Sequence, residues 1–133
     1  QRYRHVPPGG NRWNLPLSLM PECWKRKTKG GTDLFGRLWW NRPAVTIRTE
    51  FYKPEKGRYL HPEAHRPITH REAARLQGFP DDFELCGTKI SVGLQIRNAV
   101  PPPFATAIAH HIRALLSQAS ATHDRRNANG RGR

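Results

Sequence analysis

The sequence predicts a mixed α/β fold, in which an irregular basic half with short strands is followed by a half that consists of helices. Its 133 residues are enough for one domain with a modest core. Residues 1–61 hold thirteen Lys and Arg against four Asp and Glu, interleaved with proline, glycine and aromatic residues. Residues 62–118 are close to neutral and carry helical capping and periodicity signals, which indicate ordinary packed structure.

Charge and composition limit the classes of function. The formal net charge is +13 and the pI is about 11.1, so we expect a polyanionic partner, with nucleic acid first. No apolar run approaches membrane-spanning length and the first residues lack a signal-peptide pattern, so we expect a soluble, cytoplasmic protein without a membrane partner. The chain does not begin with Met, and we expect a fragment or a processed piece.

The first half contains one strand candidate. Residues 1–36 predict loops with a short helix near Leu17 to Lys27. The segment from Ala44 to Phe51 is rich in β-branched residues and alternates apolar and polar from Val45 to Arg48, which favours a strand. A turn signal, "KPEKGRY", follows it, so Arg42 to Tyr59 is predicted as a hairpin or an ordered loop.

A short, well-capped helix is predicted next. Thr69 and Glu72 have the T-x-x-E spacing of a capping box, in which each side chain accepts from the backbone N–H of the other residue. Gly78 supplies a left-handed stop, and Pro80 prevents continuation. A helix of about two turns is marginal alone, so tertiary packing must hold it.

The last helix is predicted to follow three prolines at 101–103, which suit a first helical turn that needs no backbone donors. An apolar stripe then recurs at helical spacing through about Gln118, and it consists of Phe104, Ile108, Ile112, Leu115 and Leu116. A stripe of this kind needs a surface to cover. The remaining residues, 119–133, predict a disordered basic tail.

The residues alone show no catalytic constellation. Cys23 and Cys86 stand in unrelated contexts without an evident base, so we predict that both are structural. His61 and His65 would share a helix face, but they lack a third ligand, and no metal site is expected. The strongest physical signal is the basic first half with its interleaved aromatic residues, which predicts contact with nucleic acid.

Two sequence motifs define the prediction further. "RPITHREAARLQGFPDDF" and then "QIRNAVPPPFATAIAHHI" closely resemble the last two motifs of DNA cytosine-5 methyltransferases, in the same order and at the expected separation. Upstream, "PAVTIRTEFYKPEKGRYLHP" resembles the end of that family's target-recognition region, where a Thr and an aliphatic residue precede a base-reading loop. The resemblance extends over most of Val6 to Leu116.

The resemblance implies a whole enzyme that turns a cytosine out of the DNA duplex, attacks its C6 with a cysteine thiolate, and transfers a methyl group to C5 from S-adenosyl-L-methionine. Double-stranded DNA is then a partner, and the implied DNA-binding residues are Thr46, Arg48, Thr49, Lys53 and Lys56. The implied scaffold residues, which would make structural polar contacts, are Arg66, Arg71, Glu72 and Arg75.

The resemblance also places part of the cofactor pocket in this chain. The implied cofactor-binding residues are Asn98, Ala99 and Val100, and the last helix would complete a Rossmann-like cofactor domain in the whole enzyme. The amide of Asn98 offers both a donor and an acceptor, which suits an amino-acid moiety. Arg97 departs from the family pattern, in which Gly precedes this Asn, and Gly permits a close approach or a positive φ that Arg resists.

Several motifs of the family do not occur here: the cofactor loop, the Pro-Cys nucleophile segment, the Glu-Asn-Val segment and the Gln-x-Arg-x-Arg segment. We therefore expect the C-terminal subunit or fragment of such an enzyme, which would be inactive without a catalytic half. The enzyme is expected to belong to a restriction–modification system. The predicted parts of the chain are a DNA target-recognition portion at 1–61, a scaffold helix and C-terminal helix at 62–118, and the tail. The alternative is a non-catalytic DNA-binding protein derived from such an enzyme.

Overall fold

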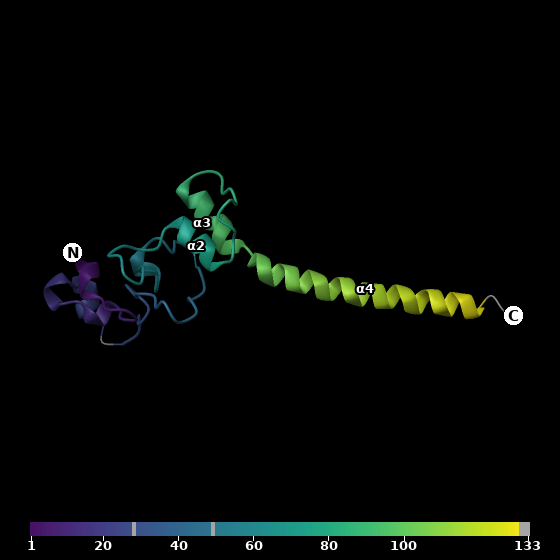
Figure 1. The fold of residues 1–133 in the computed structure, drawn as a ribbon. Coiled ribbons are helices and arrows are strands. Elements are labelled where there is room, and N and C mark those ends of the chain that lie inside the picture. The colour runs from purple at the N-terminus through teal and green to yellow at the C-terminus, as the bar shows by residue number, and fades with distance from the viewer. Residues whose placement is uncertain (28, 49, 131–133) are drawn as a thin grey trace. The chain divides into compact units, whose positions relative to one another are not determined.

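The computed structural model describes residues 1–27, 29–48 and 50–130, with side chains as far as residue 120. The chain divides into two compact units, Gln1–Ala99 and Val100–Arg133. Helices of the first unit are η1 (Arg2–His5), η2 (Arg12–Asn14), η3 (Leu17–Leu19), α1 (Glu22–Lys25), η4 (Pro54–Lys56), α2 (His70–Leu76) and α3 (Lys89–Asn98), where η denotes a 3-10 helix (Figure 1). The second unit contains α4 (Pro102–Gly130).

The centre of the first unit is the segment of Tyr59 and Leu60. The Leu60 N–H donates to the carbonyl of Gly36 at 2.9 Å, and the Leu60 carbonyl accepts from the N–H of Leu38 at 3.0 Å. On the other side, the Ile68 N–H donates to the Tyr59 carbonyl at 2.8 Å. Two isolated β-bridges result, one parallel and one antiparallel. Within residues 1–27, 29–48 and 50–130 these bridges take the place of a sheet.

The predicted strand from Ala44 to Phe51 is wrong for the residues that the structure describes. The segment keeps the alternation of a strand, with Ile47 buried and its two neighbours exposed. However, the backbone groups of Thr46 and Arg48 bond to a side-chain hydroxyl and not to a neighbouring strand. Of the two predicted alternatives, a hairpin or an ordered loop, the ordered loop is found. The short strands of the α/β prediction are absent from the described part of the chain.

Two apolar cores meet at the central segment. Leu60 belongs to one, together with Val6, Leu15, Met20 and Phe35. Tyr59 belongs to the other, which also contains Leu38, Ile47, Phe51, Ile68, Ala73, Ala74 and Ile96. Neighbouring residues in a β-bridged segment point to opposite sides, which explains why adjacent side chains enter different cores. Both cores are built entirely from residues of the first unit.

Three arginines of the basic first half, Arg12, Arg37 and Arg58, are buried and serve the fold. Their guanidinium groups donate to main-chain carbonyls: that of Gly30 for Arg12; those of Tyr3, Val6, His61 and Ala64 for Arg37; and those of Gly9, Gly10, Thr32 and Arg37 for Arg58. A guanidinium suits this task because it carries five donors and no acceptor. Part of the charge that the sequence assigned to nucleic-acid contact is therefore inside the protein.

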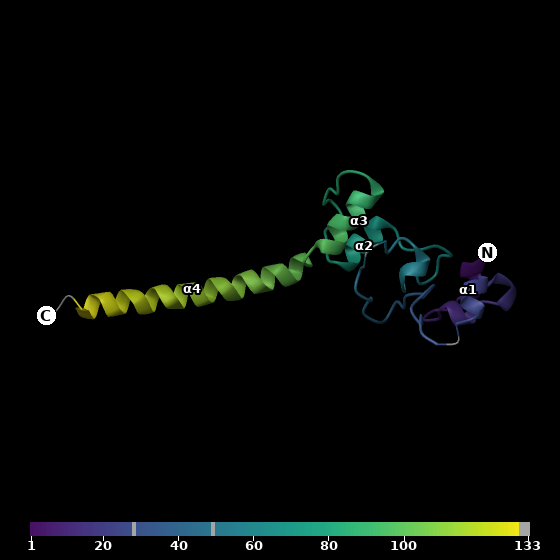
Figure 2. The same ribbon diagram turned by 180° about the vertical axis from the view of Figure 1, so that it is seen from behind.

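The capping box predicted for α2 is confirmed. Thr69 Oγ1 accepts from the Glu72 N–H at 3.2 Å, and the Glu72 carboxylate accepts from the Thr69 N–H at 2.8 Å. The helix ends before Gly78, whose φ of 79° is the predicted left-handed stop. α2 and α3 lie side by side in both views (Figures 1 and 2), and the Gln77 side chain joins them by donating to the Ile96 carbonyl at 3.2 Å.

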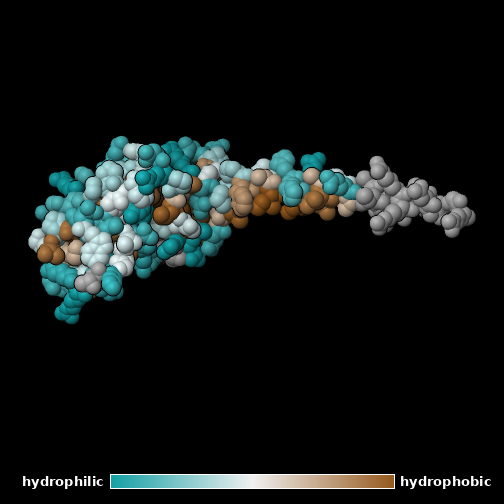
Figure 3. All heavy atoms as spheres, turned by 90° about the horizontal axis from the view of Figure 1, so that it is seen from below, coloured by the Kyte–Doolittle hydropathy of each residue, from teal (hydrophilic) through white to brown (hydrophobic). Residues whose placement is uncertain are grey.

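In the second unit, α4 begins within the three prolines, as predicted, and carries the predicted apolar stripe. All five stripe side chains are exposed: Phe104, Ile108, Ile112, Leu115 and Leu116. Figure 3 shows apolar side chains along one side of this helix. The helix continues to Gly130 and so includes most of 119–133, for which the sequence predicted disorder. No helix in the described part of the chain has the length and apolar character needed to cross a membrane.

Candidate nucleic-acid interface

One buried tyrosine holds the segment that is predicted to contact DNA. The Tyr59 hydroxyl donates to the Thr46 carbonyl at 2.8 Å and accepts from the Arg48 N–H at 3.1 Å. Ile47, between these two residues, is buried in the core. The side chains of Thr46 and Arg48 consequently face solvent from a backbone that is fixed on both sides. Burial raises the pKa of the Tyr59 hydroxyl, which therefore remains protonated and able to donate.

A small ion-pair cluster follows in the same segment, the ordered loop from Arg42 to Tyr59. The carboxylate of Glu50 pairs with the ammonium groups of Lys53 and Lys56, the latter at 3.1 Å. Hydrogen bonds from these lysines hold the pKa of Glu50 below its ordinary value. Glu50 has a φ of 58°, a left-handed conformation that is uncommon for any residue other than glycine. One acidic residue thus serves as counter-ion to both lysines.

Four of the five predicted DNA-binding residues lie on this loop. Thr46, Arg48 and Lys56 are exposed, and Lys53 is half-buried. The fifth, Thr49, lies outside the described residues. The structure brings these four side chains to one loop, and their contact with DNA stays a prediction.

Sequence reasoning missed the two residues that organise this loop, Tyr59 and Glu50. Tyr59 reaches residues eleven and thirteen positions away, and no local spacing rule covers such a contact. The ion pair of Glu50 with Lys53 has an i,i+3 spacing, which is a signal that could have been found. Its positive φ has no sequence signal.

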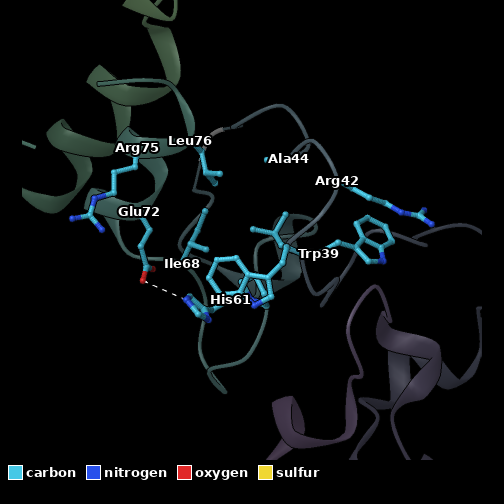
Figure 4. Close-up of a pocket in the computed structure, with 11 residues that line it drawn as sticks. Trp39, Arg42, Ala44, His61, Ile68, Glu72, Arg75 and Leu76 are labelled. Atoms are coloured by element: carbon cyan, nitrogen blue, oxygen red, sulfur yellow. Dashed lines mark ion pairs between the residues drawn. The ribbon is translucent and has the colours of Figure 1, made fainter. Parts of the chain in front are cut away.

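A cavity of about 340 Å³ opens beside the loop (Figure 4). Trp40 in its wall is 69% exposed, and the indole Nε1 donates to the Glu63 carboxylate at 2.8 Å. The ring of His61 meets this indole edge-on, with ring centroids 5.6 Å apart. Next to this group, the Arg42 guanidinium lies 5.1 Å from the ring centroid of Trp39. Trp39 is half-buried, and the exposed indole of the cavity is that of Trp40. An exposed indole is typical of surfaces that bind bases or protein partners.

An ion pair fixes the beginning of the scaffold helix. Arg66 donates to both carboxylate oxygens of Glu72 at 2.7 Å, and His61 Nε2 lies 3.7 Å from the same carboxylate (Figure 4). The Arg66 hydrogen bonds, supported by those of Thr69, lower the pKa of Glu72 to about 2. The carboxylate is therefore ionised throughout the physiological range.

Two further predicted scaffold residues bind the segment that follows α2. Arg75 donates to both carboxylate oxygens of Asp81, at 2.6 and 2.9 Å. Arg71 donates to the carbonyl of Phe83 at 3.0 Å. The predicted structural polar contacts of Arg66, Arg71, Glu72 and Arg75 are thereby confirmed.

The predicted cofactor-binding residues lie where the first unit ends and the second begins. Asn98 is the last residue of α3 and is exposed, Ala99 is half-buried, and Val100 is exposed at the beginning of the second unit. The amide of Asn98 offers a donor and an acceptor, and Ala99 and Val100 are apolar. Contact of these three residues with a cofactor stays a prediction.

Arg97 occupies the position at which the resembled family has Gly. Its φ is not positive, because it lies within α3, so the backbone here does not require glycine. Its side chain lines a second cavity, of about 190 Å³, together with Glu50 and Tyr52 of the loop and Gly93 of α3. The residue before Asn98 therefore borders the loop that is predicted to contact DNA.

The described residues supply no metal centre or cysteine centre. Cys23 and Cys86 are exposed free thiols. In the part of the chain that the structure describes, no three His, Cys, Asp or Glu side chains come together as a metal site. The loop and the cavity beside it therefore offer groups for recognition: exposed cations, the hydroxyl of Thr46 and indole side chains.

Comparison with known proteins agrees with the sequence motifs. The model of the family described as C-5 cytosine-specific DNA methylase matches residues 16–114. The type II methylase M.HgiDII of Herpetosiphon aurantiacus is 36% identical over 121 residues, which are 87% of this chain and 34% of that protein. The type II methyltransferase M1.BsuMI of Bacillus subtilis is 37% identical over 102 residues, which are 76% of this chain and 24% of that protein.

A vertebrate relative is similar over a shorter stretch. DNA (cytosine-5)-methyltransferase 1 of Gallus gallus is 46% identical over 84 residues, which are 62% of this chain and 6% of that protein. The chain therefore spans about a third or less of the length of these relatives. The family match itself includes the loop, the scaffold helix, α3 and the first turns of α4. On these matches, the chain belongs to the C-5 cytosine-specific DNA methylase family.

Proposed function

We propose that this chain is the C-terminal subunit or fragment of a DNA (cytosine-5-)-methyltransferase and that it supplies target recognition. The observation that carries the proposal is the loop anchored by Tyr59, which presents Thr46 and Arg48 to solvent beside Lys53 and Lys56. Lysine side chains suit the phosphates of duplex DNA, and the planar guanidinium of Arg48 suits base edges in the major groove.

The remaining machinery would come from a catalytic half. Two features support this: the cofactor loop and the Pro-Cys segment do not occur in the sequence, and the chain spans 34% of M.HgiDII. In the whole enzyme S-adenosyl-L-methionine would supply the methyl group, with Asn98, Ala99 and Val100 at the edge of its pocket. α4 would complete a Rossmann-like cofactor domain by covering its apolar stripe, and the chain alone would be inactive.

Each part of the chain has a proposed task. Residues 1–61 would contribute DNA recognition, and residues 62–118 would contribute the scaffold helix and the C-terminal helix that bind the catalytic half. The tail at 119–133, with an excess of basic residues, would add nonspecific attraction to DNA. We place the enzyme in the cytoplasm and assign it no metal.

Reconstitution tests this proposal. The chain is co-expressed with the part of M.HgiDII that lies outside the matched segment, and transfer of a labelled methyl group from S-adenosyl-L-methionine to duplex DNA is measured. We expect transfer with both parts and none with either part alone. Arg48→Ala should reduce transfer, whereas Lys89→Ala, which changes an exposed cation outside residues 1–61, should not. Stable assembly with no transfer, or equal effects of the two variants, would contradict the proposed role.

A non-catalytic DNA-binding protein derived from such an enzyme is the second candidate. The observation that favours it is that the first unit closes both of its cores with its own residues. A chain that folds cooperatively as a monomer, binds duplex DNA and does not associate with a catalytic half would support this candidate. The neighbouring reading frame offers a simple check, because a subunit of a split enzyme should be encoded beside a segment with the Pro-Cys nucleophile.

A further inference from the structure

Tyr59 connects the core of the first unit to the loop that carries Thr46 and Arg48. Its ring packs edge-on to Phe51, with centroids 6.4 Å apart, and lies so close to Gly57 that a Cβ there would come within 2.6 Å of it. Its carbonyl accepts from the Ile68 N–H at 2.8 Å. A side chain that is held at both its ring and its main chain places its hydroxyl at a fixed point.

The Tyr59 hydroxyl provides main-chain hydrogen bonds that a neighbouring strand would otherwise provide. It bonds the carbonyl of Thr46 and the N–H of Arg48, which are the main-chain groups on either side of buried Ile47. Among the described residues these are the only hydrogen bonds to the main chain of Thr46, Ile47 and Arg48. A hydroxyl donates one bond and accepts others, so one group can fix the peptide orientation on both sides of a residue.

We propose that Tyr59 is a specificity-determining positioning residue, whose hydroxyl sets where Thr46 and Arg48 meet DNA and so controls the sequence preference of the loop. The inference rests on the proposed function, because it takes duplex DNA as the partner of the loop. A guanidinium reads a guanine through two parallel hydrogen bonds, and such recognition tolerates little displacement of the backbone that carries it. Tyr59 does this without touching DNA, since it is 1% exposed.

The first experiment measures the anchoring itself. Tyr59→Phe keeps the ring and removes the hydroxyl, and amide hydrogen exchange by NMR reports the protection of the Arg48 N–H. We expect Tyr59→Phe to lose this protection while the amides of α2 and α3 keep theirs. Tyr52→Phe is the matched control, because Tyr52 is half-buried against the same core and its hydroxyl makes no hydrogen bond within the described residues. Unchanged protection of the Arg48 amide in Tyr59→Phe would overturn the inference.

The second experiment measures the consequence for DNA. Duplexes are enriched from a random-sequence pool with the unmodified chain, and affinities for the enriched and the unselected duplexes are compared. We expect Arg48→Ala to weaken binding of the enriched duplexes about five- to a hundredfold. Tyr59→Phe should weaken it about fivefold, as the loss of one hydrogen bond predicts, and should affect the unselected pool less. Tyr52→Phe should change neither affinity.

A double-mutant cycle separates positioning from stability. If Tyr59 acts through Arg48, the double variant should bind no more weakly than Arg48→Ala alone. Additive losses, or equal losses for enriched and unselected duplexes, would show a general structural role and overturn the inference while leaving the proposed function intact. No enrichment, or no effect of Arg48→Ala, would overturn both. Cooperative denaturation of both Tyr→Phe variants, with midpoints well above the denaturant-free conditions of the assay, confirms that the comparison is made on folded protein.

Discussion

The guanidinium of Arg66 holds both carboxylate oxygens of Glu72, at an N–O distance of 2.7 Å on each side. The same carboxylate caps α2 through the Thr69 N–H and lies 3.7 Å from His61 Nε2. One acidic side chain therefore connects the segment after Leu60, the approach to α2 and its first turn. The stability of the first unit should follow the ionisation of this group.

The first prediction concerns acid stability. In the folded chain the pKa of Glu72 is about 2, against an ordinary value of 4.5. Because the folded pKa is the lower one, the stabilisation is complete above pH 4.5 and is lost as the pH falls towards 2. We expect Glu72→Gln to lower the free energy of unfolding at neutral pH by roughly 1–2 kcal/mol, a figure reduced for the exposure of Arg66. Urea denaturation followed by tryptophan fluorescence measures it.

Glu84→Gln is the control for this prediction. Glu84 is exposed and forms no ion pair within the described residues, so its loss should leave the unfolding free energy nearly unchanged. The stability of Glu72→Gln should also depend less on pH between 4.5 and 2 than that of the unmodified chain. Identical acid titrations of the two variants would show that another carboxylate controls the acid transition.

The second prediction concerns the buried arginines. Arg37 is 2% exposed and donates to four main-chain carbonyls. Lysine keeps the charge but has no planar fork, so Arg37→Lys should leave several buried carbonyls without a donor and cost at least about 2 kcal/mol. Arg4→Lys, at an exposed position, is the control. Equal midpoints of chemical denaturation for the two variants would contradict this role of Arg37.

Local features of the fold could be predicted from the sequence. The capping box of Thr69 and Glu72 lies within four residues, and the left-handed stop at Gly78 depends on one residue type. The buried arginines could not be predicted, because Arg37 bonds the Tyr3 carbonyl 34 positions away. Separation along the chain also explains why the strand predicted after Ala44 is wrong. The apolar and polar residues alternate as predicted, but the Thr46 carbonyl bonds to the hydroxyl of Tyr59 and not to a neighbouring strand.

The candidate site, like the fold, could be predicted only in part from the sequence. Thr46, Arg48, Lys53 and Lys56 were found through resemblance to a family motif, and composition alone indicated only a basic half. The conformation of their loop is set by Tyr59, at a distance along the chain that no periodicity describes. Pattern reasoning therefore located the loop and could not say what holds it.

The third prediction concerns the internal counter-ion of the loop. Glu50 pairs with Lys53 and Lys56, so a phosphate must compete with its carboxylate for both lysines. Glu50→Gln should strengthen binding to duplex DNA by roughly two- to tenfold and steepen the salt dependence of the affinity. Glu55→Gln removes the same charge from the same loop without breaking an ion pair within the described residues, and should have a smaller effect. Equal gains in DNA affinity for the two variants would show that the effect comes from the change in net charge and not from the broken ion pairs.

The fourth prediction concerns the cofactor. Calorimetry should detect no appreciable binding of S-adenosyl-L-methionine to the chain alone, since the cofactor loop of the family does not occur in its sequence. In a reconstituted complex, Asn98→Ala should raise the cofactor Kd about ten- to a hundredfold, as expected for one hydrogen bond to a charged group. Arg97→Gly should leave the Kd unchanged or lower it. A large loss with Arg97→Gly would instead show that the second cavity, which it shares with Glu50, links the loop to the cofactor edge.

The last prediction concerns α4. Its apolar stripe is exposed on one side of the helix (Figure 3), and a continuous apolar surface of this kind marks a partner site or an aggregation risk. Ile108→Asp places a charge in the middle of that stripe, and it should abolish co-purification with a catalytic half, because an unpaired carboxylate cannot be buried there without a large cost. His110→Asp, two residues along and about half a turn around the helix, is the matched control and should assemble normally. Since both cores of the first unit consist of residues of that unit alone, both variants should retain its fluorescence and its affinity for duplex DNA. Loss of assembly with both variants would indicate helix damage, and assembly with both would place the partner surface elsewhere.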